Sequence, residues 1–152
     1  MRPRMLPDSE RGTILEIEPH HARFHPPDLI TVRWVDSMSA EAIDSIFQWS
    51  DAQVGADTRY FVIADMSRLE TVSPAVRKAA AADPRSPRIA GIAVVGASAH
   101  MRAVMGMFMK ALSLFYGERF RMAFFDTEDE AFTWVQIQRV QPDPMSERKP
   151  GT

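Results

Sequence analysis

The sequence contains no cysteine. Disulfide bonds, thiolate metal sites and cysteine nucleophiles are therefore excluded, and a reducing compartment such as the cytoplasm is the natural expectation. No apolar run reaches the 18 or more residues of a membrane span, so we do not expect the chain to cross a membrane. The first eight residues carry positive charge but no apolar stretch follows them, which is not the pattern of a signal peptide.

An excess of basic charge is also missing. The net charge is -2, and the richest basic stretch consists of Arg77, Lys78, Arg85 and Arg88, interrupted by Asp83. Because a nucleic-acid partner requires a concentrated basic surface, we expect none. This stretch is more typical of a solvated helix end and the loop after it.

Proline is scarce in the middle of the chain. Eight of the 11 prolines lie in residues 1–27 or 142–150. The 152 residues, of which 45% are hydrophobic and 25% charged, suit one globular domain with one sizeable core. We therefore expect a domain at residues 12–140, with flexible tails at 1–11 and 141–152.

The N-terminal third has the pattern of strands. Residues 13–18, 20–24 and 29–35 are short segments rich in β-branched and aromatic residues, separated by prolines, and predict an antiparallel meander. A helix follows, capped by Ser39 and ended by Gly55, with Met38 and Ile43 placed as a hydrophobic staple.

Strands and helices alternate in the remainder. The apolar runs 60–65, 89–95 and 120–125 predict buried strands, each followed by a helix. The helix starts are Ser73-Pro74, Ser98, and the capping box that Thr127 opens. Alternation of this kind implies parallel pairing. The predicted fold class is α/β, a mixed sheet with an antiparallel N-terminal part, a parallel part, and helices packed on it.

The candidate chemical residues lie where the parallel strands are predicted to end. Asp65 and Ser67 follow the first, His100 comes after the second, and Asp126 follows the third. Asp65 and Asp126 could in principle hold a magnesium ion, as in a phospho-acceptor domain, but such a domain needs a lysine after its last strand and none follows here. No serine lies in a nucleophile-elbow motif. We therefore expect no catalytic residues, no metal and no cofactor.

Three histidines cluster near the N-terminus. His20, His21 and His25 lie beside three prolines, but no further ligand has the spacing of a metal site. We interpret them as exposed loop histidines.

The long predicted helix between Ser98 and Gly117 has more apolar surface than one sheet covers. Its core stripe comprises Met101, Val104, Met105, Phe108, Leu112 and Phe115. Ala103, Met107 and Leu114 lie beside Lys110 on another side. This second surface implies that another subunit, a partner protein or an apolar ligand covers it. The alternative is that the sheet edge or an N-terminal loop of the same chain covers it.

Two segments resemble a known family. Residues 62–77, with Asp65-Met-Ser67 and Ser73-Pro-Ala-Val-Arg, are similar to the Asp-Leu-Ser…Ser-Pro-x-x-Arg segment of the SpoIIAA-like STAS/SEC14 bacterial domains. Residues 124–134 are similar to the closing Phe-Asp-x-x-Glu-Glu-Ala-x-x-Trp of that family. The resemblance covers about residues 13–139, and it implies a mixed sheet and a non-enzymatic role.

The two halves of the family name imply different partners. STAS domains are protein-interaction modules, best known as anti-sigma-factor antagonists switched by a phosphorylated serine; SEC14 implies lipid or apolar-ligand binding. The switch stretch here reads Val72-Ser73-Pro74-Ala75, with proline at the acceptor position, and Ser73 is better placed as a helix cap.

Three hypotheses follow. The first is a regulatory protein-interaction module, whose partner is another protein or a second copy of itself in a homodimer. Its interaction surface comprises Ala103, Met107, Lys110 and Leu114, and its regulatory loop contains Asp65, Ser67 and Ser73. The second is a binder of a small apolar ligand or lipid in a pocket between the long helix and the sheet. The third is an enzyme, which requires Asp65, His100 and Asp126 to converge.

Overall fold

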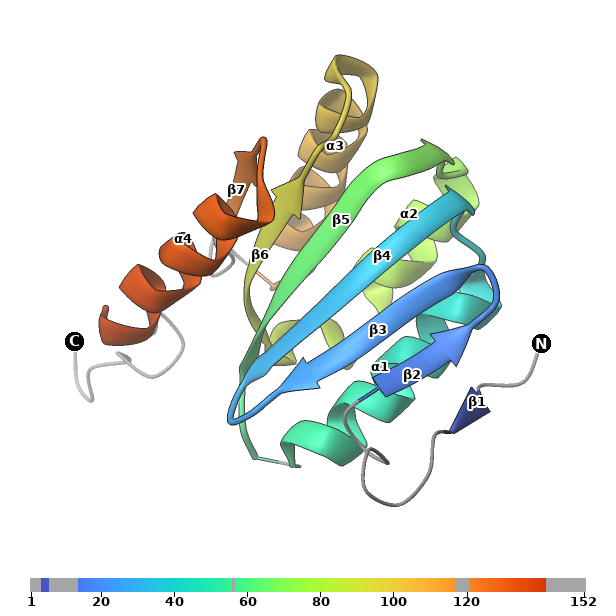
Figure 1. The fold of residues 1–152 in the computed structure, drawn as a ribbon. Coiled ribbons are helices and arrows are strands. Elements are labelled where there is room, and N and C mark those ends of the chain that lie inside the picture. Colours follow the sequence, from blue (N-terminus) through green and yellow to red (C-terminus); the bar gives the residue numbers. More distant parts are fainter. Residues whose placement is uncertain (1–3, 6–13, 56, 117–120, 142–152) are drawn as a thin grey trace.

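The chain folds into one seven-stranded mixed sheet with helices on both faces (Figure 1). The computed structural model describes residues 4–5, 14–55, 57–116 and 121–141. The strands lie side by side in chain order, β1 to β7. The first three pairings are antiparallel and the last three are parallel, which confirms the predicted fold class.

The N-terminal strands form the expected antiparallel meander. They are β1 (Arg4–Met5), β2 (Ile14–Ile17), β3 (His20–His25) and β4 (Leu29–Ser37). Arg4 and Met5 pair with Glu16 and Leu15 of β2, so these two residues of the expected N-terminal tail belong to the sheet. Nearly all other residues of the two expected tails lie outside the described part of the chain.

The helices begin where the sequence signals predict. They are α1 (Ala40–Val54), α2 (Pro74–Ala82), α3 (Ala99–Tyr116) and α4 (Glu128–Val140), with a short 3₁₀ helix, η1 (Ser86–Arg88). The hydroxyls of Ser39, Ser73 and Ser98 accept hydrogen bonds from backbone N–H groups of the first helical turns. Thr127 and Glu130 form the capping box. Gly55 ends α1 at a φ of 100°.

The central strand is longer than predicted. β5 (Tyr60–Thr71) continues well past Asp65, because β4 runs beside it as far as the Ser37–Thr71 pair, with two irregularities in register. Its other neighbour, β6 (Ile89–Val95), is shorter and pairs its last residue with Asp65. On the far side of β6, β7 (Arg121–Phe125) ends level with β6. Asp65 therefore lies within a strand, at the level where two neighbouring strands end.

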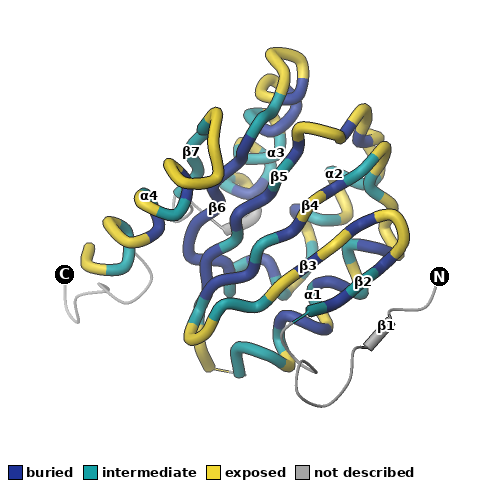
Figure 2. Tube along the Cα trace, viewed as in Figure 1, coloured by how far each residue is buried: buried dark blue, intermediate teal, exposed yellow. Residues whose placement is uncertain are grey.

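Each face of the sheet has its own core. Helices α1, α2 and α3 cover one face and α4 covers the other (Figure 1). The larger core combines the three-helix side with inward residues such as Val32 and Val94. The smaller core joins Ala131 and Val135 of α4 to Ile63 and Ala93. Buried residues are concentrated on the central strands (Figure 2). None of the described helices has the length and apolar character that crossing a bilayer requires.

The histidine cluster differs from the expectation. These residues form strand β3 rather than a loop, because they pair with β2 and β4. His20 is buried, accepts a hydrogen bond at Nδ1 from the Val35 N–H at 3.1 Å, and lies edge-on to Trp34. Burial lowers the pKa of His20 below its ordinary value. The prediction of exposed loop histidines was therefore wrong for His20.

Candidate functional site

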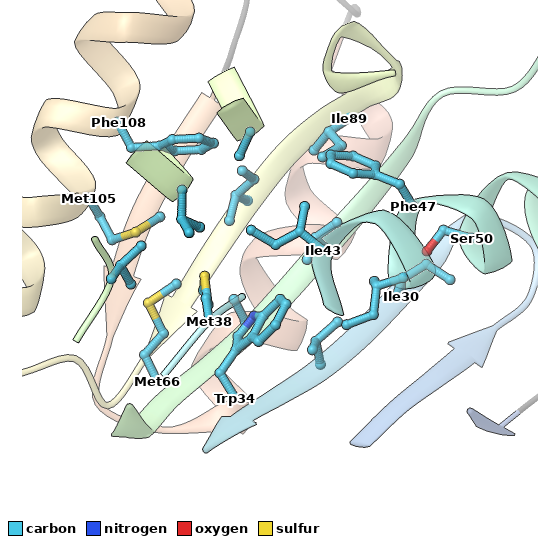
Figure 3. A pocket seen from close by; sticks show the side chains of 18 of the residues that line it. Ile30, Trp34, Met38, Ile43, Phe47, Ser50, Met66, Ile89, Met105 and Phe108 are labelled. Carbon is cyan, nitrogen blue, oxygen red and sulfur yellow. The ribbon is translucent and has the colours of Figure 1, made fainter. Parts of the chain in front are cut away.

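An apolar cavity of about 110 Å³ lies between the sheet and its three-helix cover (Figure 3). Figure 3 shows side chains from α1, α3 and the sheet directed toward the same space. The cavity wall consists of Ile30, Val32 and Trp34 of β4; Tyr60, Val62, Ala64 and Met66 of β5; Ile89 and Ile92 of β6; Ile43, Ile46, Phe47 and Ser50 of α1; Val76, Arg77 and Ala80 of α2; Met105 and Phe108 of α3; and the connecting residues Met38 and Val72.

Local sequence patterns place these side chains. The β4 and β5 wall residues are spaced by two, which is the period that brings strand side chains to one face. The wall residues of α1 recur at three- and four-residue intervals, as expected for one side of a helix. Ala64 and Ala80 also line the cavity, and because their side chains are single methyl groups they leave space beside the strand and the helix unfilled.

Few polar groups belong to the wall. Ser50 and Tyr60 are both about 1% exposed, and their side chains are hydrogen-bonded to each other. Burial raises the pKa of Tyr60 far above its ordinary value, so the phenol stays neutral. Since each of these hydroxyls already has a partner, the interior of the cavity favours hydrocarbon over a polar guest.

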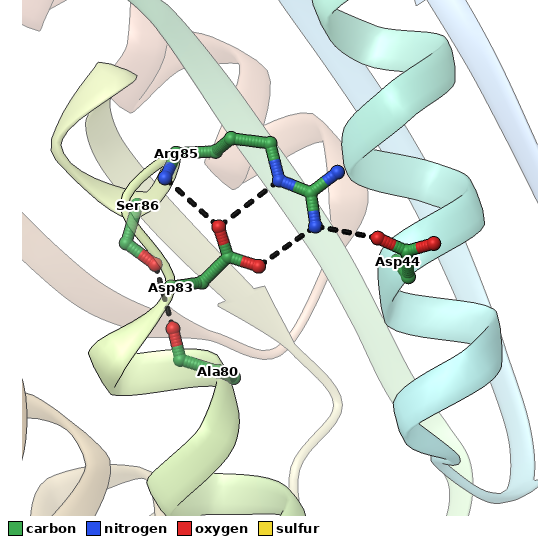
Figure 4. Close-up of polar contacts among 5 residues, drawn as sticks. All are labelled: Asp44, Ala80, Asp83, Arg85 and Ser86. Carbon is green, nitrogen blue, oxygen red and sulfur yellow. Dashed lines mark hydrogen bonds and ion pairs between the residues drawn. The ribbon is translucent and has the colours of Figure 1, made fainter.

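A charged clamp lies beside the cavity wall (Figure 4). Arg85 donates from Nε to Asp83 Oδ1 at 3.0 Å and from Nη2 to Asp44 Oδ1 at 2.7 Å. Its guanidinium also lies 5.0 Å from the ring centroid of Phe47, a wall residue. Hydrogen bonding from Arg85 holds the pKa of Asp83 below its ordinary value. The clamp thus ties the segment after α2 to α1 across one side of the cavity.

The residues predicted as a regulatory loop do not share a loop. Asp65 and Ser67 lie within β5, where Ser67 donates from both its backbone N–H and its hydroxyl to Asp65 Oδ1. Asp65 also lies 3.7 Å from Arg33. Ser73 caps α2, as its sequence position predicts, through the Val76 N–H at 3.2 Å. The loop interpretation was wrong for Asp65 and Ser67, because β5 extends through them; a regulatory role stays a prediction.

The predicted interaction surface on α3 is open. Ala103, Met107, Lys110 and Leu114 are all exposed, with Met107 at 52% and Leu114 at 88%. Met101, Val104, Met105 and Leu112 of the predicted core stripe are buried, while Phe108 is half-buried at the cavity. The side chain of Phe115 lies outside the described residues.

The three residues of the enzyme hypothesis have separate surroundings. Asp126 lies 3.5 Å from Arg102, and Asp65 is engaged by Ser67 and Arg33. His100 is exposed in the first turn of α3. Among the described residues no hydrogen bond or ion pair joins any two of the three, and no group of three metal-ligating side chains comes together. This arrangement gives no acid–base pair within proton-transfer reach.

The sequence interpretation missed most of the cavity wall. It placed a pocket between the long helix and the sheet, yet α1 and α2 each supply more residues to the wall than α3 does. The available signal was the set of scattered methionines, Met38, Met66 and Met105, because flexible side chains often fill irregular gaps. Their convergence depends on tertiary packing, which the sequence alone does not display.

The fold belongs to the mixed α/β class. Its single sheet has three helices over one face and one helix over the other. The sequence model of the SpoIIAA-like family matches residues 29–136. Because this match spans well over half of the sequence, the chain belongs to the SpoIIAA-like family. None of the curated proteins compared with the chain matches it.

A solved structure supports the same fold. The crystal structure of an uncharacterized protein of the DUF3478 family with a SpoIIAA-like fold, from Shewanella loihica PV-4, superimposes with a TM-score of 0.51. The two sequences are 14% identical, and the alignment covers 75% of this chain and 90% of the other. At this identity the likeness establishes the shared architecture.

Proposed function

We propose that this SpoIIAA-like domain is a non-enzymatic binding module that holds a small apolar ligand between the sheet and helices α1, α2 and α3. The cavity of about 110 Å³ with its apolar wall carries the proposal. Apolar cavities of roughly 150 Å³ in other proteins bind molecules the size of benzene, so a short hydrocarbon chain or a single ring has the right size.

Three wall methionines allow a direct test. Met38, Met66 and Met105 line the cavity, whereas Met107 lies on the exposed side of α3. Titration with 1-hexanol, followed by methionine-methyl NMR, should shift the first three signals and leave Met107 unchanged. Absence of saturable shifts at the cavity methionines contradicts the proposal. Native mass spectrometry of freshly purified protein checks for a retained ligand.

A small-to-large substitution sharpens this test. Ala64→Val places extra carbon in the cavity and should weaken 1-hexanol binding by about tenfold. Ala103→Val is the matched control, since Ala103 is exposed on α3 and does not border the cavity. Equal binding by both variants indicates that hexanol binds elsewhere.

The exposed side of α3 supports a second proposal, self-association through a second copy of the chain. Met107 and Leu114 present apolar surface about two helical turns apart, with Lys110 between them. Sedimentation should show a wild-type dimer that Met107→Asp dissociates. Ile137→Asp on α4 is the control, because Ile137 is 49% exposed but lies on the other side of the sheet. A wild-type monomer contradicts this proposal.

A further inference from the structure

Among the described residues that line the cavity, Arg77 alone carries a formal charge. It lies on α2 between two other wall residues, Val76 and Ala80, and its side chain is half-buried. Arginine commonly packs its methylene stem along apolar surface while its guanidinium stays at the boundary with water. The stem of Arg77 therefore belongs to the apolar wall, and we expect its guanidinium outside the cavity, where the wall meets water.

The arginines beside other wall residues differ from Arg77 in their partners. Arg85, over the ring of Phe47, is bound to Asp44 and Asp83. Arg88, over the ring of Tyr60, forms an ion pair with Asp51. For the guanidinium of Arg77, the described residues provide neither an ion pair nor a hydrogen bond. This cation at the cavity is thus available to an external anion.

Helix α2 adds to the positive potential. Its first turn contains no acidic residue, although acids at that position normally offset the positive end of a helix. Helix α2 contains no acid at all between Pro74 and Ala82. An anion placed at Arg77 therefore meets a helix whose N-terminal charge is not compensated within its first turn.

We infer that the ligand of the proposed site is an amphipathic anion, a short-chain or small aromatic carboxylate whose hydrocarbon part fills the cavity and whose carboxylate pairs with Arg77. The inference rests on the proposed function and adds the chemical class of the ligand. A planar guanidinium matches a carboxylate through two parallel hydrogen bonds, which favours a carboxylate over a neutral head group.

The experiment compares two ligands with the same hydrocarbon tail, hexanoate and 1-hexanol, at neutral pH and low salt. Affinities come from the methionine-methyl titration of the full chain. The measured quantity is the affinity for hexanoate relative to that for 1-hexanol. Arg77→Gln should lower this ratio about fivefold, because it removes one half-buried charge partner while leaving the cavity wall apolar. Arg77→Lys should restore part of the ratio.

Lys78→Gln is the matched control. It removes the same charge from the neighbouring position of α2, but Lys78 is exposed and does not line the cavity. The ratio should stay close to the wild-type value, and thermal unfolding of each variant verifies that it is folded. If Arg77→Gln and Lys78→Gln change the ratio equally, or if hexanol binds and hexanoate does not, this inference is wrong while the proposed function stands. If neither ligand binds, both are wrong.

Discussion

On the face of the sheet that α4 covers, a methyl group added at Gly91 would lie 3.0 Å from the Trp134 ring, whereas the opposite face contains a cavity of about 110 Å³. The α4 side is narrow, and small residues let one helix approach the strands closely. The other side spreads three helices over the same strands and leaves space between them. The comparison indicates that one face is closely packed and that the other encloses unfilled space.

The largest expected effect concerns the closely packed face. Val135 is 1% exposed beneath α4, so Val135→Asp places an unpaired charge in the smaller core. We expect a loss of about 4 kcal/mol in the free energy of unfolding, measured by urea denaturation. Ile137→Asp, on the exposed side of the same helix, should change it by less than about 0.5 kcal/mol. Similar losses for both variants would show that α4 is not anchored by this core.

Small-to-large substitutions test the two faces against each other. Gly91→Ala forces Trp134 and Phe61 to move and should cost about 2 kcal/mol. Ala64→Val fills part of the cavity and should stabilise the fold by about 0.5 kcal/mol. Thermal and chemical unfolding measure both changes. Destabilisation of comparable size at the two positions would contradict the packing difference between the faces.

Lowering the pH should reduce the free energy of unfolding, because His20 is buried in the folded protein. Its folded-state pKa is lowered by burial, so the unfolded chain binds a proton first as the pH falls below about 6.5. Stability is therefore fully present above that pH and decreases below it, by at most about 1.4 kcal/mol per pH unit. Of the charged groups that act on this imidazole, Asp36 opposes the shift and His21 adds to it.

His20→Gln should flatten the decline in stability between pH 7 and pH 5.5, measured by urea denaturation at each pH. Burial also lowers the pKa of His25, so part of the slope should remain. An unchanged slope in His20→Gln would contradict the assignment.

The smallest expected effect concerns the clamp beside the cavity. Asp44→Asn removes one partner of Arg85, but the Asp44 side chain is 65% exposed and Asp83 remains bound. We expect a loss of no more than about 0.5 kcal/mol in unfolding free energy. Binding of 1-hexanol should stay unchanged, since Asp44 does not line the cavity. A large loss would mean that the clamp, rather than core packing, holds α1 to the segment after α2.

Features with local causes were predictable from the sequence. Helix starts at Ser39, Ser73 and Thr127 depend on a cap and a few following residues, and all three are confirmed. The full length of β5 was not predictable, since its last residues are held by pairing with β4. The burial of His20 likewise depends on its contacts with the distant residues Trp34 and Val35.

The candidate site was predictable only in outline. Helical spacing separated the core stripe of α3 from Met107 and Leu114, and these two side chains are exposed in the structure. The cavity wall draws on six strands and helices, and its volume depends on how α1 and α2 sit beside α3. No periodicity encodes that volume, because it is the difference between the space enclosed and the side chains that fill it.

Trp34 has a consequence for how the protein can be studied. Its indole borders the cavity and also meets the ring of the buried His20, with ring centroids 4.9 Å apart. Any guest that fills the cavity therefore changes the environment of an aromatic chromophore native to the chain. The molecule contains its own optical reporter, and a version that retains Trp34 alone among its three tryptophans would signal occupancy through its emission spectrum without a label.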